Sequence, residues 1–172
     1  MSGKNSRQNK KEQFTEQKKG GTGKLIGVLG ALVVAAVVGW LVLGQGANDG
    51  FASVKPVDGF VSLDISQIND GQAHYYKLST SKGEIKFFVV KSVDGVMRAA
   101  FDACDVCYRE KKGYRQEGDF MVCNNCGQQF RTDLVNEVKG GCNPAPLKRL
   151  VENGKVLIAR ADILGGGWYF GI

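Results

Sequence analysis

The chain has little histidine and few of the motifs that mark common enzymes. His74 is the only histidine among 172 residues, and neither Cys-x-x-Cys pair is followed by one, which excludes a c-type haem attachment site. No P-loop, no Gly-x-Gly-x-x-Gly after a strand and no nucleophile–base pair is present. Hydrolase and nucleotide-dependent functions therefore have no support. For His74 itself, we expect a surface or packed strand residue, with a metal role as the alternative.

Net positive charge is nearly absent outside the N-terminus. The chain carries a net charge of +6, and residues 1–24 account for +5 of it. The remainder is close to neutral, so the basic character points to membrane topology and not to nucleic-acid binding. The basic residues of this segment are Lys4, Arg7, Lys10, Lys11, Lys18, Lys19 and Lys24.

Charge is absent altogether from residues 25–43. As a helix, these 19 residues would reach about 28 Å, one hydrocarbon core. The segment predicts a transmembrane helix, with the basic tail in the cytoplasm and residues 44–172 outside. A cleaved signal peptide is the alternative, although the apolar stretch is long for one. No cysteine lies near it, so a lipoprotein anchor is not supported.

Small residues recur every four positions along one face of this segment. Such a face lets two helices approach closely, and it predicts pairing with a second copy or with a membrane partner. The alternative is that apolar spans are simply rich in glycine and alanine. The residues are Gly23, Gly27, Ala31, Ala35 and Gly39.

The remaining chain predicts one small extracytoplasmic domain of mainly β (or α+β) class. We expect residues 1–24 to be a disordered cytoplasmic tail, 44–56 a linker and 57–172 the domain. Alternating runs bounded by turn residues predict strands and a C-terminal hairpin at Asn153-Gly154. Residues 131–138 are consistent with either a short helix or a turn, and the aromatic tail 165–172 is expected to pack on a sheet. The predicted strands are 60–65, 74–78, 84–90, 96–101, 147–151 and 155–160.

All five cysteines lie between residues 104 and 142. Cys104 and Cys107 form one Cys-x-x-Cys pair, and Cys123 and Cys126 form a second after fifteen residues. Two such knuckles can face each other and complete a tetrahedral sulfur site, so the spacing is a strong metal signal. After the second knuckle, Gly127 permits the positive φ that points backbone N–H groups at sulfur. The first knuckle has Tyr108 there, so we expect unequal halves, with Phe130 covering the site.

Cys142 follows after another fifteen residues, within Gly140-Gly-Cys-Asn-Pro-Ala-Pro146. It has three possible roles: a ligand that replaces one of the four, a ligand to a cluster or second metal, or a turn cysteine packed against the site. Asp102 and Asp105 flank the first knuckle and are either hard-cation ligands or solvated loop charges. The basic loop 109–118 between the knuckles is either a docking site or a solvated hairpin.

The cysteines leave three chemistries open. Tetrahedral zinc would make the unit a structural zinc-ribbon-like interaction module. Mononuclear iron or an iron–sulfur cluster would make it an electron carrier. Thiol–disulfide oxidoreductase chemistry is the third, but neither knuckle opens a helix in a βαβ pattern. The cysteine pattern favours an electron-transfer or metal-binding protein over an enzyme.

The cysteine motifs, together with residues 89–92, 101–108, 112–118 and 140–146, resemble the FtrD-like family of membrane iron–sulfur proteins. The resemblance covers most of the predicted domain. It implies iron or an iron–sulfur cofactor, whereas the cysteine spacing alone also allows zinc, and it implies a role in electron transfer or metal handling linked to bacterial iron transport. It implies a cytoplasmic-membrane location and an iron-permease or redox partner. The resemblance also implies that the functional residues are Cys104, Cys107, Cys123, Cys126 and Cys142.

Overall fold

The structure is a computed structural model that describes residues 49–172. The predicted cytoplasmic tail, the transmembrane helix with its small-residue face, and residues 44–48 of the linker lie outside the described residues. Within 49–172, none of the helices has both the length and the apolar character that a membrane crossing requires.

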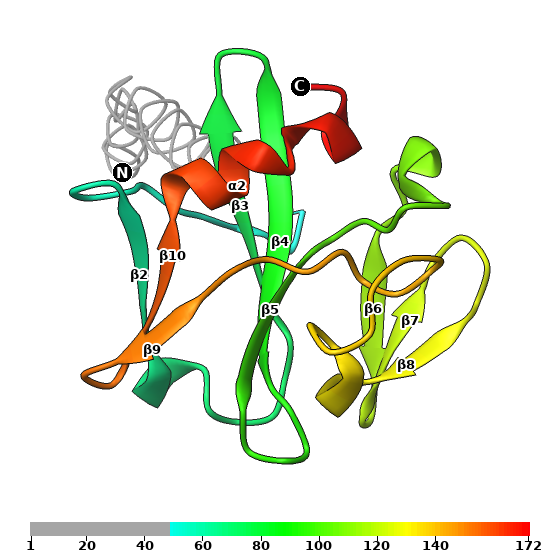
Figure 1. Cartoon of the computed structure of the whole chain (residues 1–172), viewed down its shortest axis with the longest axis horizontal. Coiled ribbons are helices and arrows are strands. Elements are labelled where there is room, and N and C mark those ends of the chain that lie inside the picture. The colour runs from blue at the N-terminus through cyan, green and yellow to red at the C-terminus, as the bar shows by residue number, and fades with distance from the viewer. Residues whose placement is uncertain (1–48) are drawn as a thin grey trace, which may run out of the picture. The chain divides into compact units, whose positions relative to one another are not determined.

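The described part is mainly β, as the sequence predicts, and it forms three sheets whose strand pairs are mostly antiparallel (Figure 1). The central sheet has the order β1-β3-β4-β5, formed by Ala52–Ser53, His74–Thr80, Gly83–Lys91 and Met97–Phe101. The second has the order β2-β10-β9, formed by Phe60–Asp64, Lys155–Ala159 and Leu150–Glu152. The third has the order β6-β7-β8, formed by Tyr114–Glu117, Phe120–Cys123 and Gln129–Arg131.

Helical segments are short and connect these strands. The α-helix α2 spans Arg160–Gly165, and four 3-10 turns are η1 Ile65–Gln67, η2 Tyr108–Glu110, η3 Thr132–Leu134 and η4 Gly167–Phe170. Residues 131–138, for which the sequence allows a helix or a turn, contain the last residue of β8, then η3 and the turns that follow it. The basic loop 109–118 is divided between η2 and β6. β1 lies within the predicted linker 44–56 and pairs in parallel with β3.

Strand β4 organises the molecule because both of its faces are buried. Ile85, Phe87 and Val89 pack into a first core, whereas the alternate residues Phe88 and Val90 pack into a second. A strand buried on both faces has a continuous apolar run, which explains why 87–90 does not alternate with polar residues. The first core includes the inward side chains of β2 and β10, and the second includes Cys104 and Cys123, with Cys107 and Cys142 packed against it.

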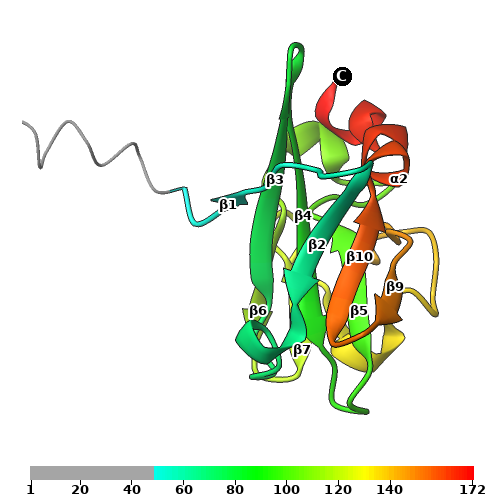
Figure 2. The same cartoon turned by 90° about the vertical axis from the view of Figure 1, so that its left-hand side faces the viewer.

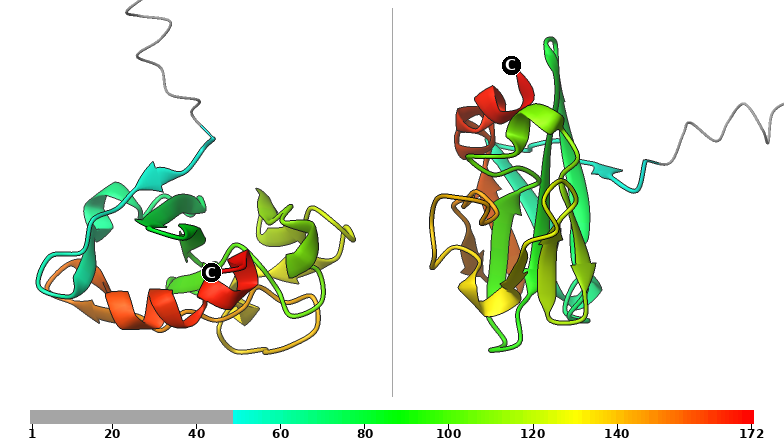
Figure 3. Two further views of the ribbon diagram at one scale, coloured as in Figure 1. Left: turned by 90° about the horizontal axis from the view of Figure 1, so that it is seen from above. Right: turned by 90° about the vertical axis from the view of Figure 1, so that its right-hand side faces the viewer.

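The two smaller sheets lie on opposite sides of the central strands. Figure 2 shows β2 and β10 in front of β3–β5, and the view from above in Figure 3 places β6–β8 at the other end. The C-terminal segment covers the first core, as predicted for the aromatic tail. Ile163 of α2 is fully buried, and the Tyr169 ring lies 5.7 Å from that of Phe101.

The free edge of β5 is occupied by irregular chain. Asn136 exchanges two hydrogen bonds with the backbone of Ala99, its Oδ1 accepting at 3.1 Å and its Nδ2 donating at 2.6 Å. Ala145 accepts a bond from the Phe101 N–H at 2.8 Å, and Leu147 donates one to Ala99 at 3.1 Å. These bonds satisfy backbone donors and acceptors along the edge of β5, although no further strand pairs there. They also fix both ends of the segment that carries Cys142.

Candidate metal centre

The fold brings all five cysteines to one place. Cys104 and Cys107 lie in the turn that leaves β5, and Cys123 ends β7. Cys126 lies in the turn before β8, and Cys142 follows the Gly140-Gly141 turn. Three segments of the chain therefore converge at the site. Each is held by an adjoining strand or by a backbone hydrogen bond to a strand.

The sulfur atoms form two groups of three with one member in common. The first group is Cys104, Cys107 and Cys142, and the second is Cys107, Cys123 and Cys126. Within each group all sulfurs lie within 4.8 Å of one another, and the Sγ atoms of Cys107 and Cys142 are 3.8 Å apart. All five are free thiols, so the arrangement offers sulfur donors and no disulfide.

The site has a buried side and an open side. Cys104 and Cys123 are almost fully buried in the second core, beside Tyr114 and Val135. Cys126 is exposed, and Cys107 and Cys142 are partly exposed. A centre held here would be shielded by the protein on one side and reachable from solvent on the other.

Backbone N–H groups support the sulfurs in both knuckles. The Cys107 N–H donates to Cys104 Sγ at 3.1 Å. In the second knuckle Gly127 has φ +73°, as expected, and no neighbour would meet a Cβ there, so the backbone conformation alone requires glycine. The Gln128 N–H that follows lowers the pKa of the Cys126 thiol. Such bonds stabilise thiolate ligands and tune a bound metal.

Two of the thiols, those of Cys123 and Cys142, resist ionisation unless a cation is present. Burial raises the pKa of Cys123 to about 11. Burial, reinforced by the neighbouring Cys126 and Cys107 sulfurs, raises the pKa of Cys142 to about 12. A bound metal ion supplies the compensating charge and deprotonates coordinating thiols outright. The donor set therefore fits a soft, thiolate-ligated metal.

Aromatic side chains enclose the site. The Tyr114 hydroxyl donates to the Cys142 carbonyl oxygen at 2.5 Å, and Tyr114 pairs with Cys123 across β6 and β7. Phe130 is partly buried and packs against the same core. Tyr114 carries no functional signal in the sequence, because only the β6–β7 register shows that it connects the second knuckle to the Cys142 turn.

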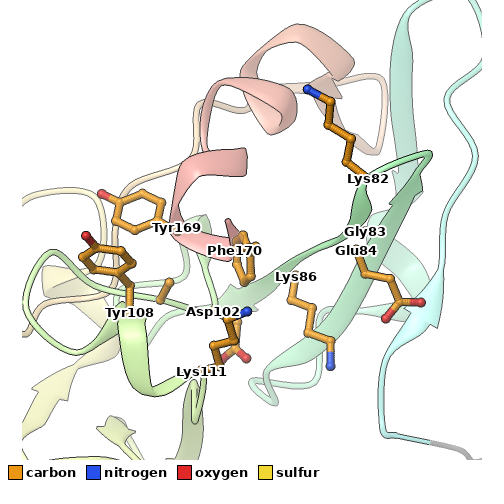
Figure 4. Close-up of a pocket in the computed structure, with 10 residues that line it drawn as sticks. Lys82, Gly83, Glu84, Lys86, Asp102, Tyr108, Lys111, Tyr169 and Phe170 are labelled. Carbon is orange, nitrogen blue, oxygen red and sulfur yellow. The ribbon is translucent and has the colours of Figure 1, made fainter. Parts of the chain in front are cut away.

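Neither flanking carboxylate belongs to the sulfur groups. Asp105 accepts a hydrogen bond from the Tyr169 hydroxyl at 2.6 Å, and Asp102 accepts one from the Tyr114 N–H at 2.7 Å. Asp102 and Ala103 line a cavity of about 350 Å³ between the β3–β4 turn and η4, with Lys111 and Phe170 beside them (Figure 4). Both aspartates thus act as hydrogen-bond acceptors that hold the knuckle to its surroundings.

Asp102 gives a pH-dependent prediction for the metal-free, reduced protein. Burial raises the pKa of this carboxyl from 3.8 to about 7, against opposing effects of the Tyr114 N–H and Lys86. The folded state holds the proton more tightly than the unfolded chain, so stability falls as the pH rises from about 4 to about 7. The free energy of unfolding should fall by up to about 1.4 kcal/mol per pH unit, and we expect Asp102→Asn to remove this decline. Urea unfolding of the wild-type chain and of Asp102→Asn at several pH values measures this difference. Parallel pH profiles of their free energies of unfolding would contradict the prediction.

The lone histidine lies outside the sulfur groups. His74, on β3, contacts Asp70 with Nε2 and Oδ1 2.9 Å apart. Neither group of potential ligands in residues 49–172 includes it. It is a partly exposed strand residue, the first of the two roles that the sequence allows.

Comparison with known proteins identifies the family. Residues 68–170 match the family described as "Membrane iron-sulfur containing protein FtrD-like". The chain belongs to the FtrD-like family. The matched range contains all five cysteines, Tyr114 and Asp102. The sulfur groups are thus a feature of the part of the chain that defines its membership.

Similarity to other proteins is slight. No curated protein matches the chain. Among solved structures, a quaternary ammonium Rieske monooxygenase CntA in complex with an inhibitor is 17% identical, with a TM-score of 0.38 over 58% of this chain and 30% of that one. Its apo form is 16% identical, with a TM-score of 0.39 over 63% and 36%. The chain spans about a third of the length of these structures.

Proposed function

We propose that this FtrD-like protein is a membrane-anchored iron-binding or iron–sulfur protein that carries electrons or handles metal in connection with iron transport. The observation that most supports this proposal is the convergence of five free cysteine sulfurs. Within residues 49–172, neither group of potential ligands contains a carboxylate or an imidazole. Thiolates suit iron–sulfur centres, and the family is described as containing iron and sulfur. Bound iron would supply one-electron redox chemistry.

The residues around the sulfurs would set the properties of such a centre. Cys104 and Cys123 face the apolar second core, which lowers the local dielectric, whereas exposed Cys126 marks the side where an electron can enter or leave. The N–H groups of Cys107 and Gln128 would stabilise negative charge on sulfur. Hydrogen bonds to sulfur and solvent exposure are the main protein influences on the potential.

The membrane assignment combines the family description with the N-terminal sequence. In this proposal residues 25–43 anchor the chain, and the domain stands on the outer side of the cytoplasmic membrane. Its partner is a membrane iron permease or a redox protein, with helix pairing along the small-residue face. A structural zinc module is the second candidate, because a 3.8 Å sulfur–sulfur distance equals the edge of a tetrahedral thiolate site.

A redox titration of the full-length protein tests the electron-transfer function. The protein is isolated in detergent without air and then reduced and reoxidised stepwise, while its visible absorption and its EPR signal are recorded. We expect reversible bleaching with a midpoint that shifts when Gln128 is replaced by proline, which removes the N–H near Cys126. A colourless protein that takes up no electrons would contradict the proposal and favour zinc.

A further inference from the structure

Cys107 Sγ belongs to both sulfur groups, and this sharing has a consequence for the number of metal ions. We propose that the five cysteines hold two metal ions, with the Cys107 thiolate bridging them. Cys104 and Cys142 would complete the protein ligands of the first ion, and Cys123 and Cys126 those of the second. The inference deepens the proposed function and rests on the same cysteine centre.

Sulfur–sulfur distances support the division. Four thiolates around one metal at about 2.3 Å lie about 3.8 Å apart. The Cys107–Cys142 distance is 3.8 Å, and every pair within a group lies within 4.8 Å. The Cys107–Cys142 pair therefore matches the edge of a tetrahedral site, and every other pair within a group lies no more than 1.0 Å beyond it. The two knuckles do not form a single group of four, because Cys104 is grouped with Cys142 and not with Cys123 and Cys126.

The ligand count requires the shared sulfur. Five donors cannot supply two separate sets of three, but they can if one thiolate bridges. Each ion then has three protein ligands, and a fourth place remains for a non-protein ligand such as inorganic sulfide or solvent. A single four-cysteine site would instead leave one crowded thiol, Cys104 or Cys142, without a metal.

Charge balance points the same way. Four thiolates around one divalent ion carry a net charge of −2 and leave the fifth thiol protonated, in a site where Cys104 and Cys123 are almost fully buried. Two divalent ions reduce it to −1, and uncompensated charge is costly to bury. The second ion therefore lowers the net charge of the cysteine centre from −2 to −1 and uses the fifth sulfur as a ligand.

Tyr114 holds the two halves in register. Its hydroxyl binds the Cys142 carbonyl, and its backbone pairs with Cys123. The turn that brings the fifth sulfur is thereby tied to the second knuckle. Tyr114 is a positioning residue: it contacts the backbone beside a ligand and supplies no ligand atom to either group.

Cobalt titration of the full-length, reduced, metal-free protein tests the inference. Co²⁺ bound to thiolates gives intense charge-transfer and d–d bands, so the equivalents bound per chain can be counted in detergent without air. We expect saturation at two equivalents. Cys142→Ser and Cys126→Ser should each leave one tightly bound equivalent, because each disrupts one group only. Cys107→Ser should weaken the binding of both ions by about tenfold or more, since it removes a ligand from each.

Cadmium provides a second measurement that does not depend on variants. With ¹¹³Cd, two resonances that are coupled through a common sulfur are expected. Saturation of the wild-type chain at one equivalent, or a single resonance, would overturn the inference. An unchanged stoichiometry in Cys142→Ser would also overturn it.

The proposed function can fail separately. If the protein isolated from cells contains no iron yet binds two cobalt ions, the iron function fails and the dinuclear site stands. If it contains iron but binds one cobalt ion, the dinuclear site fails and the iron function stands.

Discussion

Replacing Arg98 with methionine should lower the free energy of unfolding by about 3 kcal/mol. Arg98 on β5 is almost fully buried and donates to the carbonyl oxygen of Val135 at 2.9 Å and to Ser92 Oγ at 3.0 Å. It also pairs with Asp94 and Glu137, each at 2.6 Å. Removing it leaves a buried carbonyl without a donor, at a cost of about 1–3 kcal/mol, and loses charge-assisted bonds.

The effect should extend to the metal centre. Val135 packs in the same core as Cys104 and Cys123, and the segment that Arg98 holds leads to Cys142. We therefore expect Arg98→Met to unfold at lower urea concentration and to lose bound metal faster to a chelator. Arg131→Met is the matched control, because Arg131 is about half exposed and its guanidinium pairs with Asp133, two residues away on the surface. It should cost less than about 1 kcal/mol, and equal losses in the two variants would contradict the role given to Arg98.

Replacing Gly113 with alanine should cost about 2–5 kcal/mol. Gly113 has φ +64°, and a Cβ there would lie 2.0 Å from Asp102 Oδ2. The carboxylate cannot swing away freely, because its other oxygen accepts the Tyr114 N–H at 2.7 Å. The left-handed conformation costs an alanine about 1–2 kcal/mol, and overpacking adds about 1–3 kcal/mol.

Gly118→Ala separates the two causes. Gly118 lies in the next turn, between β6 and β7, with φ +56°, and a Cβ added to it would have no atom within 4 Å. It should show the conformational cost alone, measured by urea unfolding of both variants. Because Asp102 lies two residues before Cys104, only Gly113→Ala should also weaken metal binding. Equal losses of stability would show that contact with Asp102 is unimportant.

Local signals in the sequence predict much of the chain. Asp94-Gly95 and Asn153-Gly154 mark hairpins that the structure contains, and Gly127 adopts the positive φ that its place after Cys126 requires. These features depend on residues next to one another. The sheet β6-β7-β8 is not among the predicted strands, because β6 is short and lies in a stretch that resembles a charged loop.

The arrangement of the cysteines could not be predicted from spacing. Matched knuckles suggest four ligands around one ion, whereas the structure groups Cys142 with the first knuckle. That grouping depends on long-range contacts: Asn136 and residues 145–147 along β5, and the Tyr114 hydroxyl on the Cys142 carbonyl. None of these partners belongs to a motif that the sequence would reveal. Only the folded chain therefore shows that the Cys142 sulfur is held beside Cys107.

The metal and sulfide content of the full-length protein, isolated without air, tests the central claim most directly. Iron, zinc and acid-labile sulfide are measured per chain beside the visible spectrum. The account predicts two iron atoms per chain with sulfide and a visible chromophore, and a lower content of all three when Cys107 is replaced by serine. One zinc per chain, with no colour and no sulfide, would contradict it.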